Sequence, residues 1–301
     1  MSRFFWLIRR EIWEHKAIWI APIVVLGCIV LLMLTGKIQI APYDLAETPL
    51  PQFTPDQKVT LLTYAYSALA LPVFLVMGII AFFYALDSLY ADRRDRSVLF
   101  WKSLPLSDAE AVLSKFAVAI VLIPLVALAA TFAMQLLVAT GDTMKAGFGG
   151  MPAGYMWEPR AIMGGIGVAA LWCLTAMLWY APFVGYLMLA SAWAPRAPFL
   201  WAVLPPAALW ILEAVVMRSD AIGDFITERL FVLPVMLRLH EENGPASIDH
   251  AASRIEHFTS FDLYELLGAF YRSPELWLGV VAAAVLLAAA MWVRRYRDET
   301  A

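Results

Sequence analysis

The chain has 301 residues, of which 62% are hydrophobic and only 16% are charged. A soluble domain is typically about 45–50% apolar and about 25% charged, so this composition excludes a water-soluble globular protein and predicts an integral membrane protein. The net charge of −3 gives no basic excess, so we expect no nucleic-acid partner. Both cysteines, Cys28 and Cys173, lie inside apolar runs, which argues against a disulfide framework.

The N-terminal segment, residues 1–16, is predicted to form a helix that lies in the membrane interface. Its pattern places Phe5, Ile8 and Ile12 on one helical face, against charged neighbours. The first long apolar run follows directly and continues past Cys28. We therefore expect an uncleaved first span rather than a cleaved signal peptide.

Six apolar stretches are each long enough to cross a bilayer, which takes about 20 mainly apolar residues. The fourth stretch could continue past Pro182 as a kinked extension, or residues 181–193 could form a short separate segment. The predicted fold class is therefore an all-α membrane protein with both termini on one side. The six stretches are Ala17 to Leu34, Leu61 to Tyr84, Val112 to Ala139, Ala161 to Leu178, Phe199 to Met217, and Glu275 to Val293.

The distribution of Lys and Arg predicts which side of the membrane each loop faces. Short loops with an excess of Lys and Arg usually face the cytoplasm. Basic residues gather before the first span, between spans two and three, and after spans four and six, whereas carboxylates outnumber arginines in residues 218–274. We therefore expect cytoplasmic termini, an extracytoplasmic segment at 218–274, and a multi-pass protein of the inner (cytoplasmic) membrane of a bacterium.

A charged segment, residues 87–104, separates the second and third spans. Moving an Arg, Lys or Asp side chain to the bilayer centre costs about 2.5–3.5 kcal/mol, so these charges must lie outside the bilayer. The segment continues the helical pattern of the second span, presents an apolar cluster at Val98 to Trp101, and is broken by Pro105. Ser107 and Glu110 then have the spacing of a capping box, which predicts the start of the third helix.

Two interpretations of this charged segment remain open. Its arginines could serve only to fix topology, with the segment as a solvated loop. Alternatively, the segment forms a short helix that docks onto a partner. The docking interpretation is favoured because the cluster Val98 to Trp101 would cost about 25 cal/mol per Å² if its apolar surface stayed in water.

The order of these elements resembles the permease subunits of ABC-2 type ATP-binding-cassette transporters. The most specific match is LYADRRDRSVLFWKSLPLSDAEAVLSK, residues 89–115. The resemblance implies one transmembrane permease domain over residues 1–301 and a coupling helix at 87–104 that docks in a cleft of a separate ATPase. The coupling residues that it implies are Asp87, Asp92, Arg93, Arg94, Asp95, Arg96, Phe100, Trp101 and Lys102.

The resemblance also implies the partners of the chain. Family members generally combine two permease halves with two ATPases, and most are exporters. We therefore expect two ATPase copies, a second permease subunit in a homodimer, and surrounding membrane lipids. The sequence has no G-x-x-x-x-G-K-[ST] phosphate loop, since Gly36 and Lys37 are followed by Ile38. ATP and Mg are expected on the partner ATPase, and we expect neither a cofactor nor a catalytic residue in this chain.

Candidate residues of the substrate pathway lie in the spans. Spans two and five line the central cavity in the family, so the resemblance nominates apolar side chains there. Glu213 is the main ionisable residue inside a span, and it could contact substrate or pair with Arg218 one turn away. An apolar cavity would favour lipids, hydrophobic peptides or amphipathic antibiotics. The pathway candidates are Phe74, Met77, Phe82, Phe83, Trp210 and Glu213.

The outer tract before the last span holds two apolar segments, at 230–237 and 261–271, that are too short to cross. We expect re-entrant or interfacial helices, which in the family form the exit side; a small amphipathic cap is the alternative. The tract also has a His/Glu cluster between His240 and His257, but Gly244 takes the place of the second His of an H-E-x-x-H motif. A looser metal site, and with it an outer-face or intramembrane metal-dependent enzyme, stays an alternative function, as does a non-catalytic channel or scaffold subunit.

Overall fold

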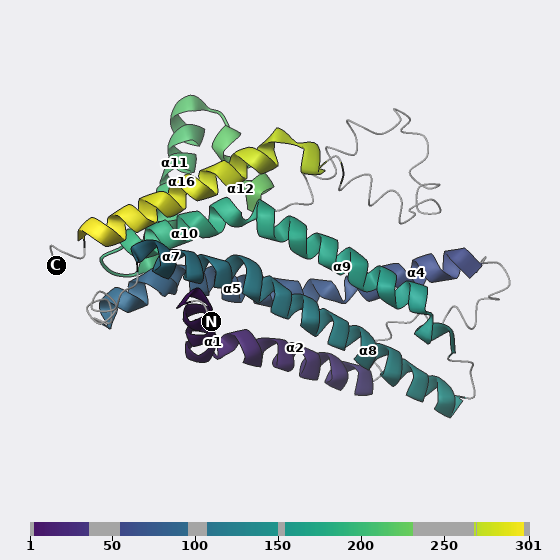
Figure 1. The fold of residues 1–301 in the computed structure, drawn as a ribbon. Coiled ribbons are helices and arrows are strands. Elements are labelled where there is room, and N and C mark those ends of the chain that lie inside the picture. The colour runs from purple at the N-terminus through teal and green to yellow at the C-terminus, as the bar shows by residue number, and fades with distance from the viewer. Residues whose placement is uncertain are drawn as a thin grey trace. The chain divides into compact units, whose positions relative to one another are not determined.

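A computed structural model describes residues 3–35, 55–95, 107–149, 154–230, 268 and 270–297 of the chain. Every regular element in these residues is a helix (Figure 1). Six helical segments are long and apolar enough to cross a membrane, and they follow the six predicted stretches in order. The predicted all-α, six-span fold is confirmed. The segments are Ala17–Leu34, Lys58–Arg94, Asp108–Lys145, Pro159–Trp179, Pro198–Met217 and Pro274–Tyr296.

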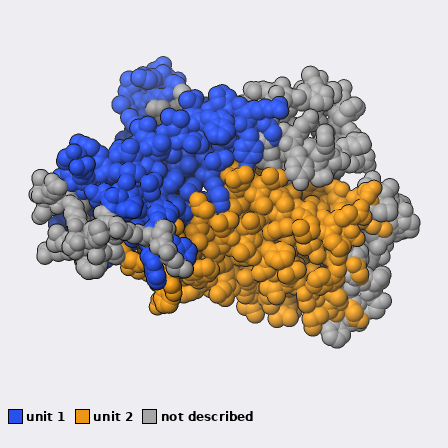
Figure 2. Space-filling view, viewed as in Figure 1, with its two compact units in different colours: residues 1–7, 82–120, 176–301 blue, residues 8–81, 121–175 orange. Residues whose placement is uncertain are grey.

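The chain forms two compact units, coloured separately in Figure 2. Unit 1 comprises residues 1–7, 82–120 and 176–301, and unit 2 comprises residues 8–81 and 121–175. The boundaries between the units fall inside helices rather than in loops.

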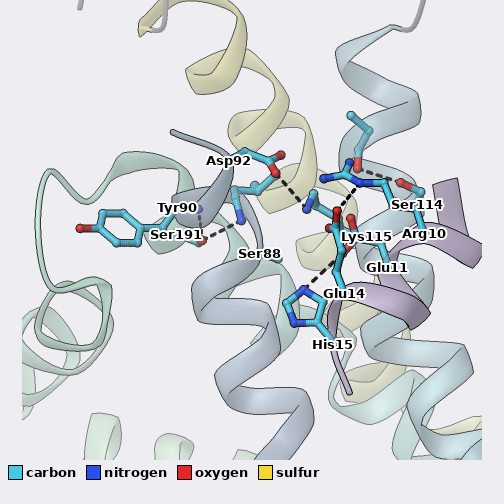
Figure 3. Close-up of polar contacts among 12 residues, drawn as sticks. Arg10, Glu11, Glu14, His15, Ser88, Tyr90, Asp92, Ser114, Lys115 and Ser191 are labelled. Carbon is cyan, nitrogen blue, oxygen red and sulfur yellow. Dashed lines mark hydrogen bonds and ion pairs between the residues drawn. The ribbon is translucent and has the colours of Figure 1, made fainter. Parts of the chain in front are cut away.

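The first predicted element is present as α1 (Arg3–Glu14), and its place in the membrane interface stays a prediction. On this helix Phe5 is exposed and Glu11 is buried. The Glu11 carboxylate lies 3.5 Å from Nε2 of His15, one turn away on the same chain (Figure 3). The acidic side chain thus points inward, while a large aromatic ring points outward.

Unit 2 contains α2 (Ala17–Leu34), which packs along α8 (Ile123–Gly149). The second span is divided here into α4 (Pro55–Ala68) and α5 (Ala70–Arg94). The Tyr66 carbonyl just before this break accepts a hydrogen bond from Nε2 of Gln135, 3.3 Å away. A side chain on a neighbouring helix therefore satisfies a backbone group near the break, as a helix interruption at membrane depth requires.

Glycine allows α9 (Pro159–Trp179) to approach this same break closely. A Cβ added at Gly165 would lie only 2.7 Å from Cβ of Tyr66, and one added at Gly164 would lie 2.9 Å from the Thr63 side chain. Small residues that bring backbones together are a common way to pack helices in membranes.

Unit 1 resolves the alternative that the sequence left open for residues 181–193. α9 ends at Trp179, and α10 (Ala181–Trp193) is a short separate helix with proline in its first turn. α10 packs along α16 (Pro274–Arg297), as Figure 1 shows. A Cβ added at Gly185 of α10 would meet the Ala283 carbonyl and the Leu286 side chain at 3.4 Å. Gly185 therefore lies at the contact between the two helices, where an added Cβ would just touch α16.

The third span is one continuous helix made of α7 (Asp108–Ala117), a π-helical turn η2 (Val118–Leu122) and α8. The predicted capping box at its start is confirmed. The Ser107 hydroxyl accepts a hydrogen bond from the Glu110 amide at 3.1 Å, and the Glu110 carboxylate accepts one from the Ser107 amide at 2.9 Å. Both contacts satisfy amides that a helix N-terminus leaves without partners.

The fifth span consists of α11 (Pro198–Leu212) and a π-helical turn η4 (Glu213–Met217), and α12 (Ala221–Leu230) follows. The Trp179 indole donates a hydrogen bond to the Arg229 carbonyl at 3.0 Å, and the Arg229 guanidinium lies 4.0 Å from the centre of the same ring. The Tyr180 hydroxyl donates to the Leu230 carbonyl. These contacts hold α12 against the junction of α9 and α10. Most of the predicted segment at 230–237 and most of that at 261–271 lie outside the described residues.

Candidate functional site at the end of helix α5

The coupling candidates begin in the last two turns of α5. Asp87, Asp92, Arg93 and Arg94 belong to this helix, and the Asp95 amide continues it by donating to the Ala91 carbonyl at 2.9 Å. The described part of the charged segment is therefore the end of the second span itself. The remaining candidates, Arg96, Phe100, Trp101 and Lys102, lie outside the described residues.

Asp92 lies between two cations in the interior of unit 1. Only 5% of the residue is exposed. Its two carboxylate oxygens lie 3.4 Å from Nζ of Lys115 and 3.0 Å from Nη1 of Arg294, and Nε of the same arginine lies 3.2 Å from a carboxylate oxygen of Asp108. Figure 3 shows Asp92 facing Lys115. Two positive and two negative side chains, from α5, α7 and α16, thus balance one another.

Pairing of this kind makes the cluster an internal anchor. A buried charge is costly unless an opposite charge and hydrogen bonds compensate it, and removing one partner of a buried pair typically costs about 3–5 kcal/mol. Because Asp92 is buried and both of its oxygens face cations inside the chain, its side chain is not part of an accessible docking face. The contacts of Asp92 are thus structural, and its coupling role stays a prediction.

Arg93 and Ser191 tie the same end of α5 to α10. Nη2 of Arg93 donates hydrogen bonds to the carbonyls of Ser191 and Ala194, at 2.5 and 2.9 Å. The last carbonyls of a helix have no partner within the helix, so Arg93 caps the C-terminal end of α10. In return, the buried Ser191 hydroxyl accepts hydrogen bonds from the amides of Leu89 and Tyr90, at 3.1 and 2.9 Å (Figure 3).

Asp87, Arg94 and Asp95 form an exposed charge network on the other side of the helix end. Nε of Arg94 lies 3.0 Å from the Asp95 carboxylate, and its Nη1 lies 3.7 Å from that of Asp87. The Arg94 side chain is 54% exposed. Exposed ion pairs contribute little to stability, so these charges are free to exchange partners when another protein approaches.

The pathway candidates of the second span lie in both units. Phe74 and Met77 belong to unit 2, where Met77 is buried. Phe82 and Phe83 belong to unit 1, and the Phe82 ring stacks on Phe183 of α10 with 6.0 Å between ring centres. Phe83 is exposed. Phe82 therefore packs between helices, whereas Phe83 projects outward.

The pathway candidates of the fifth span have different surroundings. Trp210 is exposed on α11, and Gly223 of α12 lies so close that an added Cβ would come within 2.5 Å of the indole nitrogen. Glu213 is buried at the start of the π-helical turn, and its carboxylate accepts a hydrogen bond from the Ser219 hydroxyl at 3.0 Å. Arg218 is exposed with a φ of 51°, in the left-handed region. Ser219 is thus a partner of Glu213 that the sequence did not suggest.

The sequence did not suggest Asp108, Arg294, Ser191 or Lys115 as site residues, although Lys115 and Arg294 are among the basic residues that predict the topology. A signal for Arg294 exists, because it continues a stripe of buried residues at helical spacing along α16 while its neighbour Arg295 is exposed. A charge on a buried stripe needs an opposite charge beside it, because an unpaired buried charge is costly. The stripe consists of Leu276, Gly279, Ala283, Leu287, Ala290 and Arg294.

The metal-binding alternative concerns a different part of the chain. Among the residues that the structure describes, no group of three or more His, Cys, Asp or Glu side chains could hold a metal ion. The His/Glu cluster between His240 and His257 lies outside the described ranges.

Comparison with known proteins agrees with the resemblance found in the sequence. Residues 59–156, about one third of the chain, match the family model described as ABC-2 family transporter protein. This match covers the second and third spans and the charged segment between them, so it confirms the resemblance where its motif was most specific. No curated protein and no solved structure matches the chain. Together, the six apolar helices and this match support a multi-pass membrane protein of the transporter permease type.

Proposed function

We propose that this chain is the membrane-spanning subunit of an ATP-driven exporter, in which it forms the substrate pathway and docks a separate ATPase. The observation that carries this proposal is the exposed network of Asp87, Arg94 and Asp95 at the anchored end of α5. It lies immediately before the segment with the apolar cluster Val98 to Trp101. Charged residues beside large apolar ones are the composition expected of a docking surface.

The anchoring of α5 suits a docking element that must move the membrane helices. Asp92 connects the end of α5 to α7 and α16, and Arg93 connects it to α10. Buried polar contacts of this kind hold one arrangement of the helices, so a displacement at the helix end is passed on rather than absorbed by a loose loop. Two ATPases that bind ATP and Mg, and a second copy of this chain, complete the proposed transporter.

The orientation is the second part of the proposal, with both termini in the cytoplasm and residues 218–274 outside. Cysteines placed at Ser2 and Thr300 should resist a membrane-impermeant maleimide in intact cells, and a cysteine at Ser247 should react, in a background with Cys28 and Cys173 replaced by alanine. Labelling at position 2 or 300 before lysis would contradict the orientation that the Lys and Arg distribution predicts.

Docking is tested by the double substitution Arg94→Glu with Trp101→Ala. Loss of a buried aromatic anchor commonly costs about 2 kcal/mol or more, and a reversed charge adds repulsion in a complementary interface. The affinity for the ATPase should fall more than tenfold, since each 1.4 kcal/mol is a factor of ten. The measurement is co-purification of the two subunits in detergent.

The matched control makes the same two changes on α16, Arg295→Glu with Trp292→Ala, where both side chains are exposed. This control should retain the ATPase. Undiminished recovery with the Arg94 and Trp101 variant would mean that the charged segment only fixes topology, and the proposed means of powering the protein would be wrong.

A further inference from the structure

We propose that Arg294 transmits movement of the docking segment, residues 93–107 between Asp92 and Asp108, to the last span, α16. Through α16 the movement would reach α12. Arg294 would act as a positioning residue, since it lies behind the docking surface and need not touch the ATPase itself. The inference rests on the proposed function, because it presupposes a segment between α5 and α7 that an ATPase moves.

The first argument is that one guanidinium holds both ends of that segment. Asp92 precedes residues 93–107 in the chain, and Asp108 follows them. Arg294 contacts Asp92 through Nη1 at 3.0 Å and Asp108 through Nε at 3.2 Å. Any displacement of the segment that changes the separation of its two ends must therefore act on Arg294.

The second argument is that α16 is well placed to carry such a displacement. Arg294 lies on the buried stripe of α16 with Leu287 and Ala290, and α16 packs along α10 and also against α7. Packed contacts between helices have low compressibility and transmit strain, so the contacts of α16 with α10 and α7 favour movement of the helix as a body. A force on the last turn of α16 is thus passed along the helix axis.

The third argument concerns the opposite end of α16, where it meets α12. A Cβ added at Gly279 would overlap Nη2 of Arg229, and Nη1 of Arg229 lies 3.5 Å from the Glu275 carbonyl. Arg229 also lies over the Trp179 ring. α12 belongs to the tract that we expect on the exit side, so α16 physically connects the docking end of unit 1 with that tract.

Arginine is better suited than lysine to this bridging position. Its planar guanidinium presents donors in a fixed fork, so Nη1 and Nε can hold two carboxylates at once, whereas lysine carries a single compact ammonium. The variant Arg294→Lys keeps the charge of the cluster but cannot reproduce both contacts in the same geometry. It therefore separates bridging from simple charge compensation.

The test uses the complex of the chain with the ATP-binding-cassette subunit that co-purifies with it, reconstituted in liposomes. Cys28 and Cys173 are replaced by alanine, and Leu278→Cys, a position that is 68% exposed in the first turns of α16, carries an environment-sensitive fluorophore. The measured quantities are ATPase recovery, the thermal unfolding midpoint, and the change in fluorescence on addition of MgATP. Arg295→Lys, at the exposed neighbouring position, is the matched control.

For Arg294→Lys we expect ATPase recovery within twofold of wild type and a MgATP-induced fluorescence change reduced at least fivefold per complex. Arg295→Lys should match wild type in both. A purely structural role predicts a lower unfolding midpoint for Arg294→Lys with an unchanged fluorescence response per complex, and that result would overturn the inference.

Two other outcomes separate this inference from the proposed function. If the ATPase co-purifies but MgATP leaves the wild-type fluorescence unchanged, the inference is wrong and the docking proposal stands. If no ATPase co-purifies with the wild-type chain, the proposed function fails, and the inference fails with it.

A second variant covers the case in which Arg294→Lys does not fold. Asp108→Ala removes the carboxylate that accepts from Nε of Arg294, on a side chain that is 31% exposed, and it leaves the pairs of Asp92 with Arg294 and Lys115 in place. We expect the same fivefold loss of the fluorescence response with this variant. A full response would overturn the inference.

Discussion

Asp92 and Arg93 have a different role from Arg94 and Asp95, although the four residues follow one another at the end of the same helix. Asp92 is buried against Lys115 and Arg294, and Arg93 caps α10. Arg94 and Asp95 are exposed and contact each other. The sequence suggests a single charged surface here. In the structure, Asp92 and Arg93 anchor the helix end inside the protein, and Arg94 and Asp95 form an accessible surface.

Helix geometry accounts for the difference. Successive side chains on an α-helix point about 100° apart, because 3.6 residues make one turn. Asp92 shares a face with the buried residues Ala85 and Leu89, whereas Arg94 shares a face with Asp87 and lies near the Tyr90 ring. Two charges only two residues apart therefore face the interior and the surface of unit 1.

The largest effect that this comparison predicts is that of Asp92→Ala. The change leaves the buried cations Lys115 and Arg294 without their shared carboxylate, so the free energy of unfolding should fall by about 3–5 kcal/mol. Unfolding in mixed micelles by titration with SDS measures this difference. A loss below about 1 kcal/mol would show that the cluster does not anchor the helix end, since typical surface substitutions are within about 0.5 kcal/mol.

A smaller effect is expected for Ser191→Ala. The alanine removes the hydroxyl that accepts hydrogen bonds from the amides of Leu89 and Tyr90, and one such contact is worth about 1 kcal/mol. The same unfolding measurement should register this loss, and recovery of the ATPase should be unaffected. If Ser191→Ala instead released the ATPase without lowering stability, α10 would belong to the docking surface. The contacts of α5 with α10 would then not be purely structural.

The smallest effect on stability is expected for Arg94→Gln, the counterpart of Asp92→Ala on the exposed side. Its ion pairs with Asp87 and Asp95 are exposed to solvent, so their loss should leave the unfolding curve unchanged within error. If Arg94→Gln lowered the free energy of unfolding as much as Asp92→Ala, the exposed side of the helix end would be as important for stability as the buried side.

The sequence predicted those features that depend on local pattern. The six spans follow from runs of apolar residues, and the capping box at Ser107 follows from a spacing of three residues. Both signals lie within a short stretch of chain, so no knowledge of the fold was needed to interpret them.

The roles of individual charges depend on contacts between distant segments, and the sequence could not predict them. The pair of Asp92 with Arg294 joins residues 202 positions apart, and Arg93 reaches carbonyls 98 and 101 positions away. Counting basic residues gave the same interpretation to Lys115, Arg294 and Arg295, although only the first two are buried. The period of the buried stripe on α16 distinguishes Arg294 from Arg295, but its partner becomes evident only when α5 and α7 lie beside it.

The bridge at Arg294 has a consequence for how this chain tolerates insertions and exchanges. A segment whose two ends are held by the folded protein loses closure entropy that rises slowly with its length, by about 0.6 kcal/mol for each doubling. Lengthening or replacing residues 96–106 should therefore change the free energy of unfolding little, as long as Asp92 and Asp108 remain paired with Arg294. Selection for a new ATPase could act on this short stretch while the membrane part stays constant, which makes the segment a replaceable adaptor.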